Sequence, residues 1–392
     1  MLQPFRTLFR QSMANFSSLN LLFVVLFSIA AAEGAVAAST PAAAVKGAYY
    51  PSWLLSSLPP SSIETKLFTH ILYAFLSPSN STYKFEVSDS TAPLLSNFTA
   101  ALRGKDPPVK TLISIGGASD GPTLFATIAA SALTRELFID SSIEVARKYG
   151  FDGLDLDWEM PENPKQMADL GLLFQEWRSA MKREAKATGR PPLLLTAAVY
   201  FAVDFFLSGT YRMYPVASIN ENLDWINVMC YDYHGSWDTS ATGAQAAFFD
   251  PNSNISSSYG LGSWIRAGLQ RKKVVMGLPL YGRTWKLRDP NVHGIGAPAV
   301  GLGPGDDGVL TYSQVQTFNK ENNATVKYDT TTVSTYSFQG TSWVGYDDVV
   351  STAVKVRLAR ALGLRGYFFW ALSYDKEWRI STQAYRAWTY GK

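Results

Sequence analysis

The sequence predicts an α/β protein in which parallel strands alternate with helices around a closed barrel, and three observations support this prediction. Short apolar runs rich in β-branched and aromatic residues recur along the chain, each followed by a stretch with helical periodicity. Eight such runs can be counted, the number that closes a (β/α)8 TIM barrel. Of the 392 residues, 47 % are hydrophobic, which suffices for a large buried core.

The predicted strands can be placed in chain order from their apolar runs. They are Val45 to Tyr50, Thr69 to Phe75, Lys110 to Ile115, Gly153 to Asp157, Leu193 to Val199, Trp225 to Tyr231, Val274 to Leu278 and Gly366 to Trp370. The helices are clearest at Leu133 to Tyr149 and Met167 to Ala187, where apolar residues recur at three- and four-residue spacing.

The segment between the seventh and eighth strands, Arg283 to Arg365, is too long for a single helix. Parts of it alternate like strands, at Gly308 to Tyr312, Thr325 to Tyr328 and Thr332 to Phe338. We therefore predict a small α+β insertion between strand 7 and helix 7, at about Trp285 to Gly345, followed by a helix at Val349 to Leu362. Such an insertion lies on the C-terminal rim of a barrel, where active sites are built.

The N-terminal segment has the pattern of a secretory signal peptide. Arg6 and Arg10 precede an apolar run from Leu21 to Ala32, and small residues follow through Ala38. A run of about twelve apolar residues is too short to cross a bilayer of roughly 30 Å. We therefore predict that residues 1–38 are removed and that residues 39–392 form a secreted barrel, extracellular rather than vacuolar. Four glycosylation acceptors are expected on surface loops, at Asn80, Asn97, Asn254 and Asn323.

The composition excludes several classes of function. With 35 basic and 32 acidic side chains, the net charge of +3 gives no footprint for nucleic acid or a membrane surface. The single cysteine, Cys230, excludes intrachain disulfides, and three histidines far apart in sequence argue against a histidine-rich metal site. We expect a monomer without cofactor, metal, nucleic-acid or membrane partner.

The most informative stretch runs from Phe151 to Glu159. Period-two alternation puts Asp155, Asp157 and Glu159 on one face of a strand, with leucines on the other. Carboxylates spaced about 6.6 Å apart inside a barrel repel one another and lose solvation, so a purely structural role explains them poorly. A divalent-cation site is the second alternative. Against it, the sequence has no calcium loop here and no acidic motif at another strand end.

The position of these groups along the strand favours catalysis. Glu159 falls at the barrel mouth and Asp157 one step deeper, and a like charge two residues away keeps a general acid protonated near working pH. Both leave the strand in the same direction, so they do not flank a glycosidic bond from opposite faces as two-carboxylate glycosidases require. This leaves the substrate as a source of the nucleophile.

The pattern Asp152-x-x-Asp155-x-Asp157-x-Glu159 resembles the signature of glycoside hydrolase family 18, the chitinase family. The resemblance extends over nearly all of the chain after the signal peptide. It includes Ser114 to Gly117 (Ser-x-Gly-Gly), Met229 to Asp232 (Met-x-Tyr-Asp), Tyr281 to Arg283 (Tyr-Gly-Arg), the aromatic positions Tyr49 and Phe75, and Trp370 of the eighth strand. The run from Leu193 to Tyr200 is similar to the plant class V chitinases in particular.

The resemblance implies a retaining, substrate-assisted hydrolysis of β-1,4-linked N-acetylglucosamine in chitin and chitooligosaccharides. Glu159 would protonate the leaving oxygen, and the substrate's acetamido group would attack to give an oxazolinium ion that Asp157 stabilises. Asp155 would pair with Asp157 and share its proton, and Tyr231 would hydrogen-bond the acetamido oxygen. The other substrate-binding positions it implies are Tyr49, Phe75, Gly116, Gly117, Met229, Asp232, Arg283 and Trp370.

Plainer interpretations remain open for several of these residues. Gly116 and Gly117 also suit a tight turn, and Met229 suits core packing. Cys230 is expected to pack against a helix. Four tryptophans are candidates for further stacking contacts with sugar rings, but each of them could equally well pack in the core. They are Trp53, Trp237, Trp285 and Trp378.

Two rival functions remain. The first is a non-hydrolytic, lectin-like carbohydrate-binding protein on the same barrel, against which the presence of Glu159 argues. The second keeps the chemistry but takes lipo-chitooligosaccharide signals or N-linked glycan cores as substrate.

Overall fold

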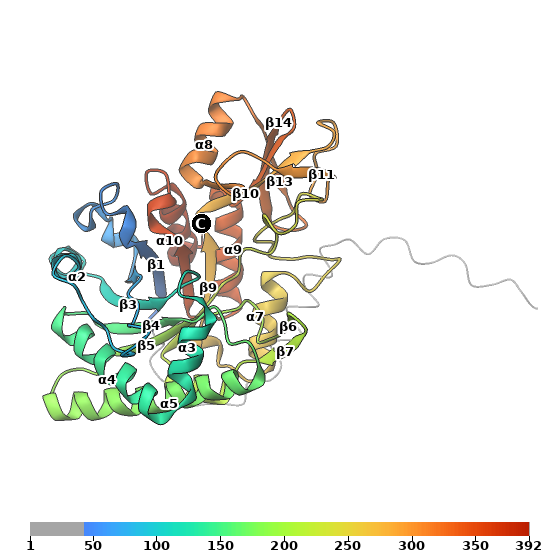
Figure 1. The fold of residues 1–392 in the computed structure, drawn as a ribbon. Coiled ribbons are helices and arrows are strands. Elements are labelled where there is room, and N and C mark those ends of the chain that lie inside the picture. The colour runs from blue at the N-terminus through green and yellow to red at the C-terminus, as the bar shows by residue number, and fades with distance from the viewer. Residues whose placement is uncertain (1–42, 392) are drawn as a thin grey trace, which may run out of the picture. The chain divides into compact units, whose positions relative to one another are not determined.

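Eight parallel strands close into a barrel in the order β1-β16-β9-β8-β5-β4-β3-β2 (Figure 1). The computed structural model describes residues 43–391, so the predicted signal peptide lies outside the described residues. Each barrel strand coincides with a predicted one to within a few residues. Their bounds are β1 Val45–Pro51, β2 His70–Ala74, β3 Lys110–Gly116, β4 Gly153–Asp157, β5 Leu194–Val199, β8 Trp225–Val228, β9 Val274–Pro279 and β16 Gly366–Trp370.

Helices surround the barrel and cover the outward faces of its strands. They are α2 Ala92–Arg103, α3 Gly121–Ala130, α4 Ala132–Lys148, α5 Pro164–Thr188, α6 Val216–Asn222, α7 Ser257–Arg266, α9 Val349–Ala361 and α10 Arg379–Tyr390. Short 3₁₀ turns occur at Ser52–Leu54, Pro60–Ser62, Thr65–Leu67, Arg271–Lys273 and Leu372–Tyr374. The longest helix, α5, begins at Pro164 after Asn163, whose side chain accepts a hydrogen bond from the Gln166 amide. It ends at Gly189, which has a left-handed backbone.

The core has two layers, as the alternation along the strands requires. Outward side chains such as Leu154 and Leu156 join the large cluster between strands and helices. Inward side chains form a smaller cluster in the barrel, which includes Tyr49, Trp225 and Phe368. A barrel of eight strands is therefore filled by side chains, and its chemistry is confined to the rim.

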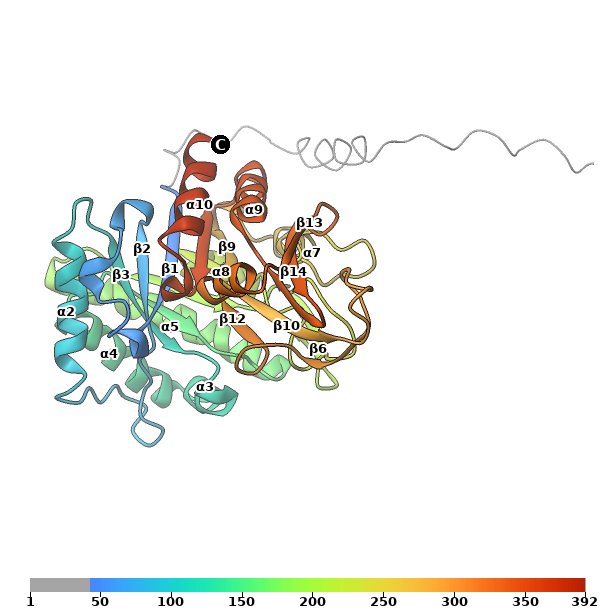
Figure 2. The ribbon, with the colours of Figure 1, turned by 90° about the horizontal axis from the view of Figure 1, so that it is seen from above.

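The insertion is an antiparallel sheet with one helix. Its elements are β10 Tyr281–Leu287, β11 Ala299–Leu302, β12 Val309–Thr311, α8 Tyr312–Glu321, β13 Thr325–Asp329, β14 Ser334–Gln339 and β15 Ser342–Tyr346. The sheet order is β11-β10-β15-β14-β13, with β12 also paired to β10. In both views it lies on the side of the molecule opposite α2 and α4 (Figures 1 and 2).

The insertion begins earlier than the sequence predicts, at Tyr281 rather than Trp285. Strand β10 follows β9 after a single residue, and its first residues, Tyr281 and Gly282, are both buried. Burial on both faces removes the alternation that would have revealed the strand. Farther along the sheet, Trp285 and Trp343 form a small core of their own.

A hairpin after β5 was not predicted. Strands β6 (Asp204–Leu207) and β7 (Thr210–Met213) are joined by Ser208 and Gly209, which both have positive φ, as a type I′ turn requires. The Ser-Gly pair was the available signal. The hairpin carries the exposed side chains of Phe206 and Tyr211.

Three of the four glycosylation acceptors lie in exposed loops or turns, whereas Asn97 does not. Asn97 lies on the exposed face of α2, and its sequon residues Phe98 and Thr99 are buried. The loop prediction for Asn97 was wrong because its polar neighbours form one face of an amphipathic helix. Among residues 43–391, no helix combines the length and the apolar character needed to cross a membrane.

Candidate active site

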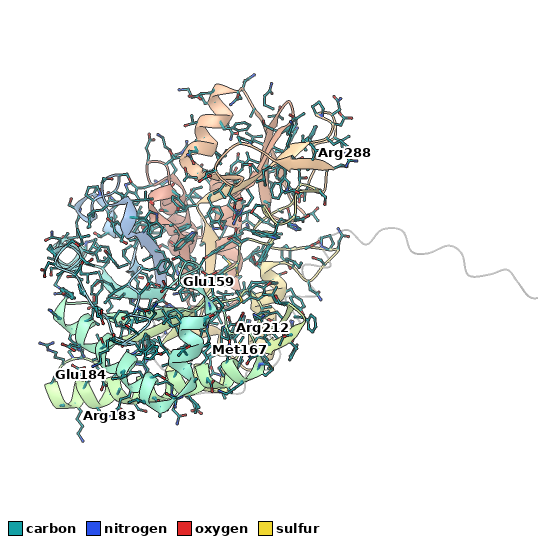
Figure 3. All side chains as sticks on the ribbon, viewed as in Figure 1. Glu159, Met167, Arg183, Glu184, Arg212 and Arg288 are labelled. Atoms are coloured by element: carbon teal, nitrogen blue, oxygen red, sulfur yellow. The ribbon has the colours of Figure 1, made fainter. Side chains whose placement is uncertain are left out.

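Strand β4 carries the acidic residues into the barrel mouth. Asp155 and Asp157 lie on its inner face and are almost fully buried. Glu159 follows two residues beyond the last strand residue and is partly exposed. Figure 3 shows it in the middle of the molecule, between the barrel and the insertion. The neighbouring strand β3 places Ser114 beside Asp155 and Gly116 beside Asp157.

Asp155 is held by four donors from four strands. Its Oδ2 accepts hydrogen bonds from the hydroxyls of Tyr49 (2.9 Å) and Ser114 (2.8 Å). Its Oδ1 accepts from the Thr196 hydroxyl (2.6 Å) and the Asn227 amide (3.1 Å). Burial raises the pKa of Asp155, and these four hydrogen bonds oppose that rise.

The predicted proton sharing between Asp155 and Asp157 is not formed in this arrangement. Asp155 uses both oxygens for its four donors, and no hydrogen bond joins the two carboxyl groups, both of which the structure describes. The buried Oδ1 of Asp157 has no hydrogen-bond partner. The sequence could not reveal this, because the donors come from strands far away in the chain.

The pKa values of Asp157 and Glu159 are both raised. Burial is the largest cause for Asp157, followed by the nearby charges of Glu159 and Asp155. Burial is also the largest cause for Glu159, followed by the charge of Asp232. Because an acidic group with a raised pKa keeps its proton longer, this environment suits a general acid.

Two glycines let strand β3 approach its neighbours. Gly116 has φ of +108°, and a Cβ atom there would lie 2.3 Å from the Asp157 carbonyl oxygen. Gly117 has φ of +87°, and its Cβ would lie 2.6 Å from the Phe75 ring. Its amide donates to the Asp157 carbonyl at 2.8 Å. Both glycines therefore act by close approach, which keeps Asp157 and Phe75 in place.

Aromatic rings form an apolar face at the mouth of the barrel. Trp370 stacks on Phe75 with ring centroids 5.7 Å apart and lies 5.6 Å from the Tyr49 ring. Trp53, which is 56 % exposed, lies 6.3 Å from the Phe75 ring and 6.5 Å from the Trp370 ring. Flat apolar rings of this kind match the C–H face of a sugar.

The far side of the site comes from the end of β8 and from β10. Met229 and Tyr231 are partly buried there, and burial, followed by the charge of Asp157, keeps the Tyr231 pKa well above its usual value. The Tyr231 hydroxyl is therefore a proton donor at neutral pH. Asp232 has a left-handed backbone (φ 59°) and accepts from Nε (2.9 Å) and Nη2 (2.7 Å) of Arg283.

The four tryptophans suggested as sugar platforms divide into two pairs. Trp53 and Trp237 are exposed, and the Arg283 guanidinium lies 5.0 Å from the Trp237 ring centre. Trp285 is fully buried and donates to the Asp238 carbonyl, and Trp378 packs against the barrel core near Phe68. Of the two interpretations left open, core packing fits Trp285 and Trp378, and the sequence could not decide because an aromatic residue looks alike whether buried or exposed.

Several contributing residues were missed by sequence reasoning. Thr196 and Asn227 hold Asp155, and Gln245 contacts the backbone of Asp232. The only signal for Thr196 and Asn227 was a polar residue inside an apolar strand, β5 and β8 respectively, and Gln245 had none. Cys230 is buried, and burial raises its thiol pKa to about 12, consistent with packing rather than reactivity.

The donors around Asp155 also bear on the cation alternative. Hydroxyl and amide hydrogens point at its oxygens, which fits a carboxylate held by hydrogen bonds and leaves no oxygen for a metal. In residues 43–391 there is no group of three or more His, Cys, Asp or Glu side chains placed to hold a metal ion.

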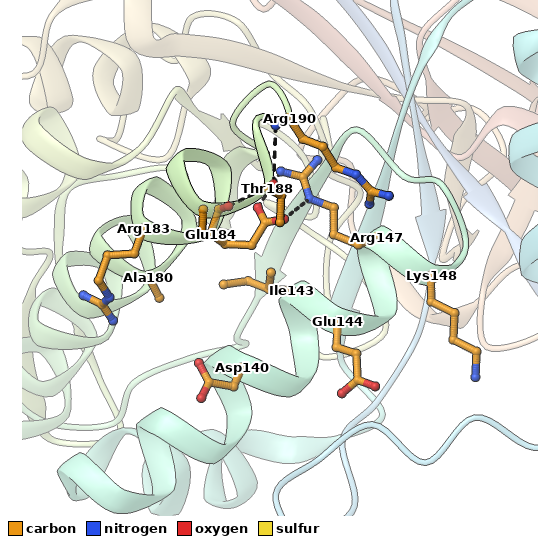
Figure 4. A pocket seen from close by; sticks show the side chains of 11 residues that line it. Asp140, Ile143, Glu144, Arg147, Lys148, Ala180, Arg183, Glu184, Thr188 and Arg190 are labelled. Atoms are coloured by element: carbon orange, nitrogen blue, oxygen red, sulfur yellow. Dashed lines mark hydrogen bonds and ion pairs between the residues drawn. The ribbon is translucent and has the colours of Figure 1, made fainter.

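A hollow lies elsewhere, between α4 and α5 on the outside of the barrel (Figure 4). It encloses about 1050 Å³ and is lined by charged side chains, among which Arg147 pairs with Glu184 at 2.6 Å. Glu184 and Arg183 of this hollow lie far from Glu159 in Figure 3. This hollow lies on the helices outside the barrel, and its lining includes none of the site residues described above.

Comparison with known proteins identifies relatives over most of the chain. The family described as "Glycosyl hydrolases family 18" matches residues 46–375. Nod factor hydrolase protein 1 of Medicago truncatula is 57 % identical over 350 residues, covering 88 % of this chain and 90 % of the relative. Class V chitinase CHIT5b of the same organism is 54 % identical over 346 residues, covering 88 % and 90 %.

Solved structures give the same result. A class V chitinase mutant from Nicotiana tobaccum in complex with NAG4 has a TM-score of 0.84 and 39 % identity, covering 89 % of this chain and 100 % of that one. A chitinase-like agglutinin from Robinia pseudoacacia has a TM-score of 0.80 and 40 % identity, covering 88 % and 100 %. The fold is therefore shared by proteins named as enzymes and by one named as an agglutinin.

Proposed function

The chain belongs to glycosyl hydrolases family 18 and to the plant class V chitinases within it, and from this premise we propose that it cleaves chitooligosaccharides by substrate-assisted, retaining hydrolysis. The observation that carries the proposal is that Asp157 ends β4 and Glu159 follows two residues later, close enough for its charge to act on Asp157. The other carboxylate whose charge acts on Glu159, that of Asp232, is engaged by Arg283. A nucleophile supplied by the substrate fits this one-sided arrangement.

In this mechanism Glu159 donates its proton to the glycosidic oxygen. The acetamido oxygen of the sugar whose glycosidic bond breaks attacks the anomeric carbon of that sugar. Asp157, whose buried Oδ1 has no hydrogen-bond partner, supplies the negative charge that stabilises the resulting oxazolinium ion. Tyr231, whose hydroxyl stays protonated, donates to the acetamido oxygen and holds it for attack. Glu159 then takes a proton from water, which opens the oxazolinium with net retention.

The sugar undergoing reaction rests on the aromatic face of Trp370, and Phe75 and Trp53 extend that face. The Asp232–Arg283 pair offers a charged group to sugar hydroxyls on the opposite side. These contacts orient the acetamido group, and correct orientation supplies a large part of the rate enhancement in intramolecular attack.

The experiment that tests the proposal is a time course on N-acetylglucosamine hexamer with the wild type and Glu159→Gln, followed by mass spectrometry. We expect cleavage by the wild type alone. Hexamer binding by calorimetry should be largely kept in the variant, because glutamine preserves shape but has no transferable proton. Cleavage by Glu159→Gln at the wild-type rate would remove Glu159 from the proposed role. Binding without cleavage by the wild type would favour the lectin alternative.

Lipo-chitooligosaccharides are a second candidate substrate, favoured by the 57 % identity to a relative named Nod factor hydrolase. Parallel assays of a lipo-chitooligosaccharide and the unmodified oligosaccharide of equal length would decide between them by kcat/KM. A higher kcat/KM for the lipo-chitooligosaccharide would make the acylated compound the preferred substrate. No activity on the lipo-chitooligosaccharide would remove it as a candidate.

We further propose secretion, which rests on residues 1–38 of the sequence. N-terminal sequencing of protein recovered from the apoplast should find a start near residue 39. Protein recovered from inside the cell with Met1 intact would contradict secretion.

A further inference from the structure

Gln245 lies behind the site and bridges two backbone segments that carry site residues. It belongs to the loop between β8 and α7, and its side chain is 2 % exposed. Its Nε2 donates to the Tyr281 carbonyl at 2.8 Å. Its Oε1 accepts from the Asp232 amide at 3.3 Å, and its own carbonyl accepts from the Tyr233 amide at 2.9 Å. One side-chain amide therefore connects the end of β8 to the start of β10.

The segment that Gln245 holds needs support from outside. Asp232 has a left-handed backbone, which an aspartate adopts at some energetic cost. Its side chain is 37 % exposed, so surrounding atoms restrain it little apart from the contact with Arg283. The hydrogen bond that the Asp232 amide donates to Oε1 of Gln245 fixes the backbone from which this carboxylate projects.

The position of Gln245 is itself fixed. The carbonyl of the next residue, Ala246, accepts from Nζ of Lys355 at 2.5 Å, and the same ammonium group binds both oxygens of Asp347 at 2.7 and 2.6 Å. Lys355 is 1 % exposed. Gln245 thus reaches Asp232 from a rigid, buried base.

We propose that Gln245 is a positioning residue: its amide holds the left-handed turn that presents the Asp232 carboxylate to Arg283 and to the cleft. This inference rests on the proposed function, because it assigns a support to a group of that same site. Gln245 itself touches neither Glu159 nor the expected position of the sugar, and it acts through Asp232.

The charge of Asp232 gives the proposal a measurable consequence. After burial, the Asp232 charge is the named cause of the raised Glu159 pKa. The groups that face this pair are Asp157, Tyr214 and Tyr231 around Glu159, and Tyr231, Tyr281 and Arg283 around Asp232. If Asp232 loses its fixed position and turns to solvent, Glu159 loses a like charge and its pKa falls. Arg283 also loses its partner, which weakens sugar binding.

The test is the pH dependence of hexamer hydrolysis by Gln245→Met, which removes both hydrogen bonds at nearly constant volume. The basic limb of the kcat/KM profile, which reports loss of the Glu159 proton, should move down by about half a pH unit or more. KM should rise by a factor of about 3 or more. Gln245→Asn keeps an amide but is one methylene too short to reach both partners, so it should move the limb in the same direction.

Thr284→Val is the matched control. Thr284 is buried on β10, the strand that also carries Tyr281, the partner of Gln245. Its hydroxyl donates to the Pro304 carbonyl at 2.7 Å. Thr284→Val removes a buried hydrogen bond next to Arg283 but leaves Asp232 held by Gln245. We expect a lower melting temperature and an unmoved basic limb.

A double-variant cycle separates positioning of Asp232 from general disturbance. In an Asp232→Asn background there is no charge left to position, so Gln245→Met should produce no further shift of the limb. A further shift there, or an unmoved limb and KM in active Gln245→Met and Gln245→Asn, would overturn the inference while leaving the proposed function intact. Failure of the wild type to cleave the hexamer would overturn both.

Discussion

Asp155, Asp157 and Glu159 are the same kind of group in three different surroundings. Asp155 accepts four hydrogen bonds, Asp157 leaves one buried oxygen without a partner, and Glu159 is partly open to the cleft. Hydrogen bonds to a carboxylate favour its charged form, whereas burial and neighbouring negative charges favour the neutral form. Neighbours, and not residue type, therefore distinguish these three carboxyl groups.

Asp157→Asn should lower kcat on the hexamer by about 100-fold or more, because the positive oxazolinium ion loses its negative partner. The variant also removes a negative charge beside Glu159, so the pKa of Glu159 falls and the basic limb of the pH profile moves to lower pH. Steady-state rates between pH 4 and 9 measure both effects. An unchanged profile would mean that the two carboxyl groups are not coupled.

The same substitution should stabilise the fold at neutral pH. The pKa of Asp157 is raised in the folded protein, so the group holds its proton more tightly folded than unfolded. Its ionisation therefore opposes folding once the pH exceeds the unfolded value near 3.8, and the penalty grows until the folded pKa is passed. At pH 7, Asp157→Asn should melt about 2–4 °C above the wild type. The difference should vanish near pH 4, and a constant difference across pH would contradict this account.

At the scale of elements, close approach of β3 to β4 determines where the carboxylates lie. Gly116 and Asp157 are register partners, and only a residue without Cβ allows this spacing. The other end of the site depends on β10, which leaves the barrel directly after β9 and brings Arg283 to Asp232. Strands β4 and β10, which are far apart in the chain, thus carry the two ends of the site.

Gly116→Ala should disrupt the site because the new Cβ would lie 2.3 Å from a backbone oxygen. We expect a loss of more than about 2 kcal/mol of folding free energy, together with a large fall in kcat. Gly121→Ala is the control, because Gly121 also has positive φ but nothing lies within 4 Å of its added Cβ. It should lose about 1 kcal/mol and keep its activity. Chemical denaturation and hexamer kinetics measure both, and equal effects would contradict the close-approach argument.

The barrel strands were predictable from sequence because each is a short apolar run bounded by polar residues. β4 was placed at Gly153–Asp157 without error, and the alternation of its acids and leucines also gave the facing of its side chains. β10 and the β6–β7 hairpin were missed. The first lacks visible alternation because it is buried, and the second depends on two positive φ values at Ser208 and Gly209.

Site residues could be predicted where the alternation along one strand coincides with a family motif. Residues that donate hydrogen bonds to them from distant strands could not be predicted. Glu159 and Asp157 follow from one strand, but the Asp155 donors Thr196 and Asn227 lie on β5 and β8. Gln245 has no local signal, since its two backbone partners are 13 and 36 positions away in the chain. Contacts of this kind depend on closure of the barrel.

For the whole molecule, a buried ion pair joins the insertion to the barrel. Asp347 follows the last insertion strand, β15, and Lys355 lies on α9, with side chains 1 % and 2 % exposed. The Lys355 ammonium also binds the Ala246 carbonyl of the β8–α7 loop. The end of β15, helix α9 and the β8–α7 loop therefore share one charge network, which ties the insertion to the barrel.

Lys355→Met should lower the free energy of unfolding by about 3–5 kcal/mol, because it leaves the Asp347 carboxylate buried without a charged partner. The double variant Lys355→Met with Asp347→Leu should recover much of the loss, since no uncompensated charge remains. Denaturant titration measures both variants. A double variant no more stable than the single one would show that the pair does not act as a unit.

The central claim is that the substrate's acetamido group is the nucleophile, and proton NMR of the first hydrolysis products tests it most directly. During hexamer cleavage by the wild type, the new reducing ends should appear first as the β-anomer, before mutarotation, because attack from within the sugar followed by water gives net retention. A parallel hexamer whose acetamido groups are replaced by hydroxyls should not be cleaved. Initial α-anomer, or cleavage of the hydroxyl analogue at a comparable rate, would contradict the claim.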